Sequence, residues 1–536
     1  MTLLLDRRLL LKAASLGLGA LAVPGVAQMA SARGFTHGVA SGEPRQRSVM
    51  LWTRYVPGGR VHWQVSRSED FRRIVAEGDA SAEAERDHCV KAVATGLQPD
   101  RWYYYRFRDG RGGVSPTGRT RTLPEGRTQR FNLGIFSCAN LAFGFFNAYG
   151  HAAARNDIDL LVHLGDYYYE YPHGTYPSAR TAVPGRFHPE TEAFQLDSYR
   201  LRHAMYRADP DLQRLHARFP MVLMWDDHET ANNSWQGGAE NHDPDKEGAW
   251  SARKAAALQA YREWLPVSDQ SWESYEIGDL AALFRLETRL TARSRMRAYE
   301  EVLKRGEDMK AGLIRFRDTA WRDPEMTMMG SEQEAWLAGG LKRSAKQGTR
   351  WQLLAQQTLM GSLALPIEAK GWLRADAPAA VARAVAAGAA ASEVGLPLNL
   401  DAWDGYPAAR DRLLRSALDA DSDLLVLTGD SHNGWAFDLD LAGTPAGTEF
   451  AGQSVTSPGL EGYAIDVAPG QLESAFRARN PALKWADASR RGYLTLSLTR
   501  DRATGEWLSL DTVRTRSTRL AATQRMSVTR GRRRFA

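Results

Sequence analysis

Short stretches in which apolar and polar residues alternate fill the chain from Gly34 to about Leu123. Clusters of Gly, Pro, Asp and Ser separate these stretches, which include VMLWTRY, VHWQVSRS, HCVKAVATGL and WYYYRF. Alternation with a period of two is typical of strands that bury one face, and regularly spaced short strands favour two packed sheets. The pattern predicts a β-sandwich domain over residues 34–123, with a short linker at its end.

The periodicity changes after Phe131, where apolar strands alternate with amphipathic helices. Such alternation is typical of an α/β domain. The later strands follow one another without helices, which indicates a second sheet that faces the first. We predict an α/β domain over residues 128–515 and a basic tail over residues 516–536. The helices that the pattern predicts span residues 145–155, 199–209, 246–265, 331–346 and 407–420.

Four of the predicted buried strands end on residue types that bind metal ions. FNLGIFSC ends at Cys138, DLLVHLGD ends at Asp166, MVLMWDDHE contains Asp227, and DLLVLTGDSH contains Asp430 and His432. Reactive groups of open α/β sheets gather just beyond the carboxyl ends of the strands, so we expect these four ends to form one polar pocket. Thiolate, carboxylate and imidazole groups suit metal ions, and the pattern favours a metallohydrolase.

Each motif taken alone also has an ordinary structural explanation. The rings of HLGDYYYE could simply pack together, and one Asp of WDDHE could cap a helix with His228 packed beside it. A single Cys at a strand end is usually just buried. The adjacent carboxylates of Asp226 and Asp227 repel each other unless a cation or a proton offsets their charge. The occurrence of four such strand ends in one chain is what favours the metal site.

Length and charge narrow the class of protein. A chain of 536 residues exceeds what one hydrophobic core usually organises, so two domains are expected. The formal net charge of +6 is modest, and part of it lies in the leader and in the terminal RGRRRF. This excess suits the attraction of phosphate-bearing substrates but is too small to indicate specific nucleic-acid binding.

Residues 1–32 predict an export signal. Arg7 and Arg8 precede a stretch rich in Gly, Ala and Leu, and the segment resembles a twin-arginine signal with Leu10 where that pattern prefers Phe. An ordinary secretory signal or a membrane anchor is the alternative. Glycine and proline residues interrupt the apolar stretch, so we expect no stable membrane span. The twin-arginine export machinery is therefore an expected partner, and the expected location is periplasmic or secreted.

Cysteine usage agrees with export in a folded state. Cys89 and Cys138 are the only cysteines, so the chain has no disulfide framework. They fall in different predicted domains, and we expect both thiols to be free; a Cys89–Cys138 bridge is the alternative. Twin-arginine export carries folded proteins, often with a cofactor already bound, which suits a metal site that is filled before export.

FSCAN, HLGDYYYE, MWDDHE and TGDSHNGW together resemble motifs of the PhoD-type alkaline phosphatases, a branch of the calcineurin-like metallophosphoesterase superfamily. VASGEP, DAWDGYPAAR, SVTSPG and RGYLTLSLT are similar to further signatures of that branch, so the resemblance covers nearly the whole chain. It implies a four-layer α/β/β/α sandwich and a metal-dependent phosphoesterase. The segment ATGLQPDRWYYYRF resembles the end of an immunoglobulin-like or fibronectin-like domain, which would precede the catalytic domain.

The resemblance also implies that the centre contains ferric iron (Fe3+) and calcium (Ca2+). Asp166 would bridge the two ions, and acidic ligands on the second side favour calcium because hard cations prefer oxygen. The choice of Asp227 rather than Asp226 depends on matching DDHE to the GNHE strand end of related purple acid phosphatases. The implied iron ligands are Cys138, Asp166, Tyr169 and His432, and the implied calcium ligands are Asp166, Asp227 and Asp430, with Asn140 as a weaker candidate.

Two further residues are candidates for contacts with the substrate. His228 falls where the superfamily places a substrate-side histidine, and we expect it to donate a proton to the leaving oxygen or a hydrogen bond to a non-bridging one. Arg289 follows the strand LFRLETR and is predicted to clamp phosphate, whereas Arg293 is expected to be a surface arginine. The sequence has LETR where the family commonly has an Asp, which leaves the substrate contacts open.

The leading hypothesis is an exported phosphoesterase that hydrolyses small phosphate esters or phosphodiester polymers with metal-activated water. Two functions of other classes stay open at this point. In the first, the β-sandwich binds a polymer and the metal site is only structural. In the second, the centre is a binuclear-iron redox site, since thiolate and phenolate both bind ferric iron.

Overall fold

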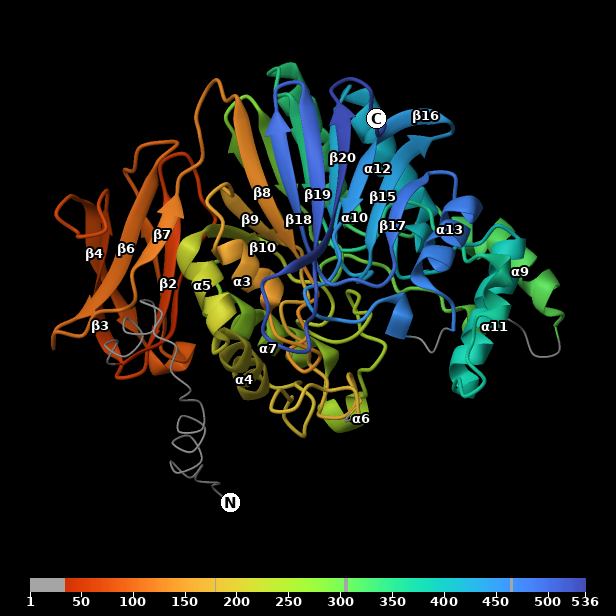
Figure 1. Ribbon diagram of the computed structural model, residues 1–536, viewed down its shortest axis with the longest axis horizontal. Helices are drawn as coiled ribbons and strands as arrows, with labels where there is room; N and C mark the ends of the chain where they lie inside the picture. Colours follow the sequence, from red (N-terminus) through yellow and green to blue (C-terminus); the bar gives the residue numbers. More distant parts are fainter. Residues whose placement is uncertain (1–33, 179, 303–306, 463–465) are drawn as a thin grey trace.

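The computed structural model describes residues 34–178, 180–302, 307–462 and 466–536 (Figure 1). The predicted export signal at 1–32 lies outside these ranges. Among the described residues, no helix combines the length and the apolar character needed to cross a membrane.

Sheet 1 contains nine strands and forms the centre of the molecule. β1, β10, β9 and β8 run parallel to one another, and the remaining strands of the sheet pair antiparallel. Every residue of β9 and β10 is buried, which explains their unbroken apolar pattern. In spatial order the strands are β20 (Leu520–Thr529), β19 (Arg502–Leu510), β18 (Gly492–Thr499), β8 (Arg130–Phe136), β9 (Leu160–His163), β10 (Pro220–Leu223), β1 (Phe35–Gly42), β2 (Val49–Tyr55) and β5 (Cys89–Ala94).

Sheet 2 contains seven strands, and its centre is also parallel. β12, β13, β14 and β16 pair parallel, while β11, β15 and β17 are added antiparallel. Its spatial order is β11 (Glu273–Ile277), β12 (Ala281–Arg285), β13 (Trp351–Ala355), β14 (Leu424–Thr428), β16 (Thr444–Ala451), β15 (Gly434–Leu441) and β17 (Leu483–Asp487).

The helices divide between the two outer faces, and the five predicted helices are all present. The α-helices are α3 (Asn147–Ala153), α4 (Leu196–Arg207), α5 (Pro210–Arg218), α6 (Pro244–Glu247), α7 (Trp250–Trp264), α8 (Tyr299–Val302), α9 (Met309–Asp318), α10 (Gly330–Lys346), α11 (Ala379–Glu393), α12 (Pro407–Asp419) and α13 (Pro469–Arg479). Short 3-10 helices lie at η1 (Ala84–Arg86), η2 (Ala320–Arg322), η3 (Ile367–Gly371), η4 (Trp403–Gly405) and η5 (Leu460–Gly462).

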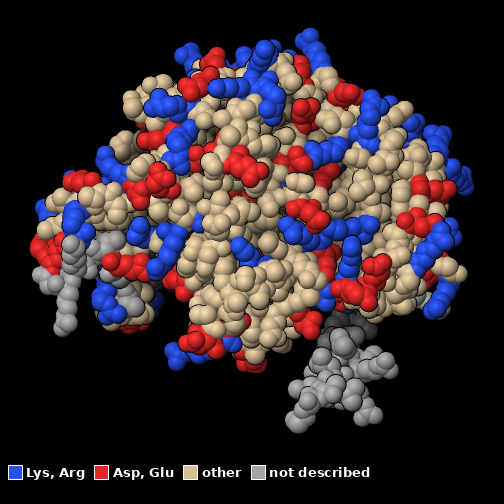
Figure 2. Space-filling model, turned by 180° about the vertical axis from the view of Figure 1, so that it is seen from behind, with Lys and Arg blue, Asp and Glu red and all other residues tan. Residues whose placement is uncertain are grey.

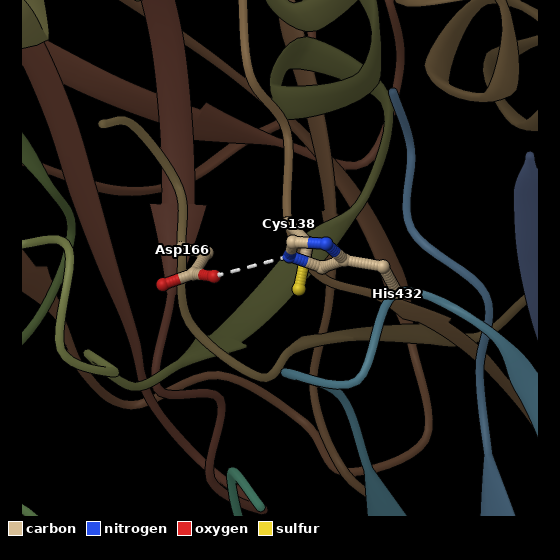
Figure 3. A group of neighbouring side chains, drawn as sticks. All are labelled: Cys138, Asp166 and His432. Atoms are coloured by element: carbon tan, nitrogen blue, oxygen red, sulfur yellow. Dashed lines mark ion pairs between the residues drawn. The ribbon is translucent and has the colours of Figure 1, made fainter. Parts of the chain in front are cut away.

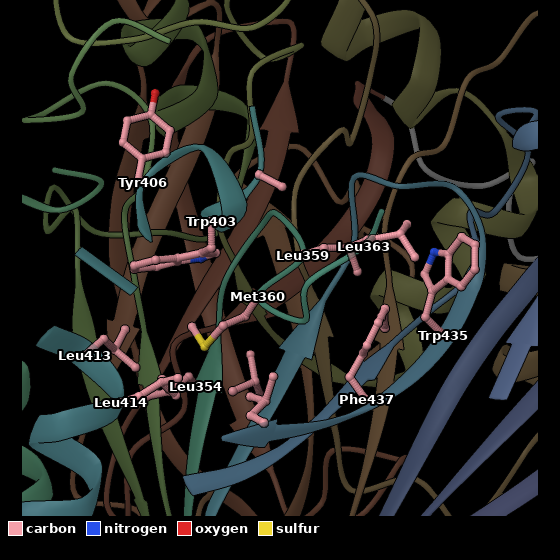
Figure 4. Close-up of a cluster of buried hydrophobic side chains, with 14 of the residues drawn as sticks. Leu354, Leu359, Met360, Leu363, Trp403, Tyr406, Leu413, Leu414, Trp435 and Phe437 are labelled. Carbon is pink, nitrogen blue, oxygen red and sulfur yellow. The ribbon is translucent and has the colours of Figure 1, made fainter. Parts of the chain in front are cut away.

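Three hydrophobic clusters separate four layers. One lies between the sheets and includes Leu133 of β8 and Leu353 of β13. A second joins sheet 1 to α3, α4, α5 and α7, and includes Leu212. The third joins sheet 2 to α10 and α12; Figure 4 shows part of it, with Leu413 of α12 and Leu354 of β13. The expected α/β/β/α sandwich is confirmed.

The strand-only N-terminal domain is also confirmed, with one feature that the pattern did not predict. β3 (Gly59–Ser66), β4 (Ile74–Ala82), β6 (Trp102–Asp109) and β7 (Gly118–Arg121) form a separate sheet that packs on β1, β2 and β5. β1 also pairs with β10 through Ser41 opposite Pro220 and Gly42 opposite Met221. One face of the sandwich therefore continues directly into sheet 1, which holds the two domains in a fixed arrangement.

The predicted basic tail at 516–536 is wrong in its central part. Leu520–Thr529 forms β20, which pairs with β19 at the edge of sheet 1. The chain end is held by Asp421 and Asp423, which precede β14 and receive contacts from Arg533 and the Gly531 amide. The terminus therefore lies at the opposite end of β14 from Asp430. The small and polar residues of LAATQRMSVT alternate too weakly in hydrophobicity to identify a strand.

Candidate metal centre

The four predicted strand ends converge at one edge of the two sheets. Cys138 follows β8, Asp166 follows β9 and Asp227 follows β10, all in sheet 1, whereas Asp430 and the nearby His432 follow β14 in sheet 2. Three overlapping groups of potential ligands result, and the ligand atoms within each group lie within 4.8 Å of one another. The predicted convergence of the strand ends is present, and both sheets contribute to it.

The first group, here called the cysteine cluster, consists of Cys138, Asp166 and His432 (Figure 3). The imidazole Nε2 of His432 lies 4.0 Å from Oδ2 of Asp166. The Tyr169 hydroxyl donates to the same Asp166 oxygen at 2.9 Å and lies 3.1 Å from His432 Nε2. A thiol, a phenol, an imidazole and a carboxylate therefore meet at one point.

The second and third groups extend this arrangement toward sheet 2. Asp166, Asp227 and His228 form the second, here called the bridging group. Asp226, Asp227 and Asp430 form the third, here called the carboxylate cluster. Because Asp166 belongs to the first two groups and Asp227 to the last two, the three are one continuous site.

The ligand positions have an unusual backbone conformation. The φ angles of Cys138, Asp166, Asp430 and His432 are 59°, 52°, 58° and 62°. Residues with a side chain adopt this left-handed region infrequently, and such residues cluster at functional sites. The sharp turns aim the four side chains inward from the strand ends, at a cost in local stability that the surrounding sheets offset.

Two glycines allow the loops to approach one another. A Cβ atom at Gly165, where φ is +104°, would lie 2.4 Å from the Cβ of Asp226. A Cβ atom at Gly429 would lie 2.6 Å from the Cβ of Ser137. Because side chains cannot pack at these distances, a larger residue at either position would push the ligand loops apart.

The cysteine cluster fits a cation on the chemistry of its donors. Burial raises the pKa of the Cys138 thiol well above its usual value, and the nearby Asp166 charge raises it further. Burial and Asp166 act in the same direction on the pKa of Tyr169. Oδ1 of Asp166 is buried and has no hydrogen-bond partner among the described residues. A cation at this point would offset the negative charge and occupy the unused oxygen.

His228, a member of the bridging group, also packs against the ring of Tyr169. Its ring centroid is 4.2 Å from that of Tyr169, and its Nδ1 lies 2.8 Å from Oε2 of Glu170. Burial alone would lower the pKa of His228, but the charges of Asp227 and Glu170 raise it well above its usual value. The contact with Glu170 fixes the orientation of the ring and leaves Nε2 without a hydrogen-bond partner among the described residues.

Two glutamates that the sequence reasoning did not assign hold the site together. Glu229 accepts the backbone N–H groups of Asp166, Tyr167 and Asp226, and so joins the loops after β9 and β10. Burial raises the pKa of Glu229 to about 8. Glu170 accepts from the backbone N–H of Asn232 in addition to its contact with His228. Glu170 is the last residue of HLGDYYYE, and Glu229 is the last residue of MWDDHE. An acidic residue so close in sequence to the predicted ligands was the signal that could have identified them.

The prediction that Arg289 clamps phosphate does not fit its contacts. Its side chain is completely buried, and Nε, Nη1 and Nη2 are bound to Asp226, Asp401 and Asp430 respectively. No guanidinium nitrogen is left for a substrate. The expectation that Arg293 lies on the surface is also wrong, because Arg293 is buried and binds the carboxylate of Asp401 at 2.5 Å.

Asn140 is not placed as a ligand. Its side-chain oxygen accepts from the backbone N–H of Ala142, and its side-chain nitrogen donates to the carbonyl of Tyr176. Both ends of the amide are therefore used to shape the loop after β8. The expectation about cysteines is confirmed, since Cys89 and Cys138 are both free and buried.

Asp226 and Asp227 differ in their partners, which bears on the choice between them. Asp226 is ion-paired to Arg289 at 2.5 Å. Among the described residues, the Asp227 carboxylate accepts only backbone N–H groups, from His228 and Asn233, and its nearest contact with Arg289 is 3.9 Å. Asp227 is therefore the better placed of the two to bind a cation.

Known proteins share both domains of this chain. A model of the PhoD-like phosphatase family matches residues 133–507, and a model of the N-terminal domain of PhoD-like phosphatases matches residues 20–124. The chain is 35% identical over 456 residues to alkaline phosphatase D of Bacillus subtilis (strain 168), which covers 79% of this chain and 70% of the relative.

A solved structure described as the structure of PhoD matches with a TM-score of 0.76 at 29% identity, over 94% of this chain and 92% of the other. The fold, the order of the two domains and most of the catalytic domain are thus shared with one family. The resemblance inferred from the motifs is confirmed. The chain belongs to the PhoD-like phosphatase family and is a hydrolase of phosphate esters.

Proposed function

We propose that the protein is an exported, metal-dependent phosphatase whose centre holds ferric iron beside calcium. The observation that carries this proposal is the overlap of the three ligand groups, in which a thiol, a phenol and an imidazole lie on one side and carboxylates on the other. Thiolate and phenolate suit ferric iron, whereas an all-oxygen environment suits calcium.

Each ion would have its own ligands and share one. Asp166 has one oxygen turned to Tyr169 and His432 and a second, Oδ1, without a partner among the described residues, so it can bridge. In this assignment Cys138, Asp166, Tyr169 and His432 hold the iron, and Asp166, Asp227 and Asp430 hold the calcium. When bound, the ions supply an activated water and offset the charge of the phosphate group.

His228 acts on the leaving group. Its Nδ1 is held by Glu170 at 2.8 Å, so the free Nε2 faces the region between the ligand groups. A proton held at Nε2 passes to the leaving oxygen as the phosphorus–oxygen bond breaks. Tyr169 packs against the ring at an interplanar angle of 36° and, with Glu170, prevents it from turning away.

The substrate is a phosphate ester, either a small molecule or an exposed group of a phosphodiester polymer. The face in Figure 2 carries Lys and Arg interspersed with Asp and Glu rather than gathered in one continuous area. Export by the twin-arginine machinery to the periplasm or beyond rests on the leader sequence alone.

Hydrolysis of a chromogenic phosphate monoester and of the matching diester tests this function. Protein loaded with iron and calcium should release the chromophore, and a calcium chelator should abolish turnover until calcium is restored. The variant Lys484→Ala changes an exposed residue of β17 and should behave like wild type. It controls for losses of activity that come from purification and metal loading. Full turnover after removal of all metal, or none with any metal supplied, would contradict the proposal.

A further inference from the structure

Four rings form a closed set on one side of the ligand groups. The ring centroid of His228 lies 4.2 Å from that of Tyr169 and 5.2 Å from that of Tyr171. The ring of Tyr176 closes the set, with its centroid 5.7 Å from that of Tyr171 and 5.8 Å from that of Tyr169. Rings attract one another at separations of this order, so the four side chains hold one another in place.

The four rings differ in their exposure to solvent. Tyr169 and His228 are buried, whereas Tyr171 and Tyr176 are half-buried. The set therefore runs from the interior of the site to the surface of the protein. A molecule that enters from solvent meets the rings of Tyr171 and Tyr176 before it reaches His228.

Tyr171 and Tyr176 are each tied to the site by their surroundings. Burial raises the pKa of Tyr171, and nearby carboxylates that include Asp227 raise it further, so its hydroxyl stays protonated and the ring is neutral. The backbone carbonyl of Tyr176 accepts from the side-chain nitrogen of Asn140 at 3.2 Å. The two rings are thus placed before any substrate binds.

The position of His228 determines where the leaving group of a substrate lies, and this step rests on the function proposed above. The phosphate group is held at the ligand groups, and its leaving oxygen receives a proton from Nε2 of His228. The organic part of the leaving group is bonded to that oxygen and extends toward solvent. The half-buried ring that packs against His228 is that of Tyr171, and Tyr176 lies beside it.

We propose that the rings of Tyr171 and Tyr176 form a wall that binds the leaving group, so that the enzyme prefers phosphate esters of flat aromatic alcohols to esters of alkyl alcohols. A flat ring bonded to the leaving oxygen packs against this wall without moving it, because the two tyrosines are already held by their neighbours. Contacts between aromatic rings contribute more than the apolar area that they bury, and an alkyl chain lacks this contribution.

A purely orienting role for these rings, in which they only hold His228, predicts the opposite result. Loss of a proton donor harms esters of alkyl alcohols most, because these alcohols are poor leaving groups. Loss of a binding wall harms the ester with the largest flat ring most. The variant Tyr171→Ala removes one ring of the wall and therefore distinguishes the two roles.

The kinetics of three substrates test the wall: 2-naphthyl phosphate, phenyl phosphate and propyl phosphate. The two aryl alcohols have similar acidity and differ in ring area, so their comparison reports binding rather than the strength of the leaving group. Wild type should have a lower KM for the naphthyl ester than for the phenyl ester. In Tyr171→Ala, kcat/KM should fall about 3- to 10-fold for the naphthyl ester, less for the phenyl ester, and hardly at all for the propyl ester.

Two further variants serve as controls. Tyr171→Phe keeps the ring and should keep the preference for the naphthyl ester. Phe187→Ala removes an exposed ring that lies 6.1 Å from the ring of His173, and it should leave the kinetics of all three esters unchanged. A loss in Tyr171→Ala that is equal for all three esters, or largest for propyl phosphate, would overturn the wall.

Binding of analogues that cannot be hydrolysed tests the wall without turnover. Benzylphosphonate and ethylphosphonate carry a carbon atom in place of the ester oxygen, and calorimetry gives their Kd for the metal-loaded protein. Wild type should bind benzylphosphonate about 3- to 10-fold more tightly, and Tyr171→Ala should lose most of this preference. Equal affinities in wild type would overturn the wall. A wild-type protein that shows the preference but hydrolyses none of the esters would contradict the proposed function alone.

Discussion

The cysteine cluster and the carboxylate cluster lie at the same edge of the same two sheets, and they share neighbours, yet their chemistry differs. The cysteine cluster places a thiol, a phenol and an imidazole around one carboxylate and contains no arginine contact to these donors among the described residues. The carboxylate cluster gathers three aspartates around the buried guanidinium of Arg289.

The difference shows how one fold can prepare two unlike cation environments a few ångströms apart. Strand ends in sheet 1 supply the thiol and the phenol, whereas Asp430 and the arginine pair come from loops of sheet 2. Asp166 and Asp227 belong to the bridging group and connect the two sides. Substitutions of residues that the two clusters share can therefore be compared with substitutions confined to one cluster, and this comparison separates the roles of the two clusters.

Replacing the shared carboxylate should have the largest effect. Asp166→Asn keeps the size of the side chain but removes the charge that both proposed ions use. We expect kcat/KM for a chromogenic phosphate ester to fall by about 10³-fold or more, with loss of both iron and calcium from the protein. Steady-state kinetics measure kcat/KM, and elemental analysis measures the iron and calcium contents. Loss of one ion alone would show that Asp166 does not bridge the two ions.

Removing the proton donor should separate catalysis from ion binding. His228→Asn should lower kcat by about 10²- to 10⁴-fold while the iron and calcium contents stay at the wild-type values. Substrates with better leaving groups should lose less activity, because they need less help from a proton donor. An equal loss for good and poor leaving groups would argue that His228 only contacts the phosphate.

Tyr169→Phe should affect the cysteine cluster and spare the carboxylate cluster. The hydroxyl donates to Asp166 and accepts from Ser457 at 2.8 Å, so its removal deletes a proposed iron ligand and a hydrogen bond to a carboxylate. A tyrosinate bound to ferric iron gives a charge-transfer band in the visible spectrum. We expect this band to be present in the iron-loaded wild type and absent from the variant, and activity to fall about 10- to 100-fold. Calcium content should not change. Ser457→Ala, which removes only the supporting hydrogen bond, is the matched control and should keep the band.

Glu170→Gln should have the smallest effect of the four. The amide can still contact Nδ1 of His228, but it no longer carries the charge that holds the ring. Outer partners of functional groups typically contribute about 10- to 100-fold, and we expect the lower end of that range in kcat. KM and both ion contents should stay near wild type; a change confined to KM would place Glu170 in substrate binding instead.

Much of the site could be predicted because it follows strand ends. FNLGIFSC, DLLVHLGD and DLLVLTGDSH each show an apolar run that stops at a polar residue, and parallel strands bring such ends to one edge. The role of Arg289 could not be predicted, because its carboxylate partners lie far away in the sequence. Arg289 binds Asp401, 112 positions later, and only the folded chain shows that its donors are used.

Two features of the fold were hidden for a different reason. The pairing of β1 with β10 depends on two residue pairs between distant segments, and no local pattern reports it. β20 carries small and polar residues at the edge of sheet 1, so the basic composition of the terminus was its only visible property. Local hydrophobic pattern identifies buried strands well, and it identifies exposed edge strands poorly.

Anomalous diffraction at the iron absorption edge tests the assignment of the two clusters most directly. Crystals of the purified protein should show one iron peak in contact with Sγ of Cys138 and the hydroxyl oxygen of Tyr169. A lighter ion that gives no iron signal should lie between Asp227 and Asp430. An iron peak on the carboxylate cluster, or a cysteine cluster without bound iron in active protein, would contradict the account.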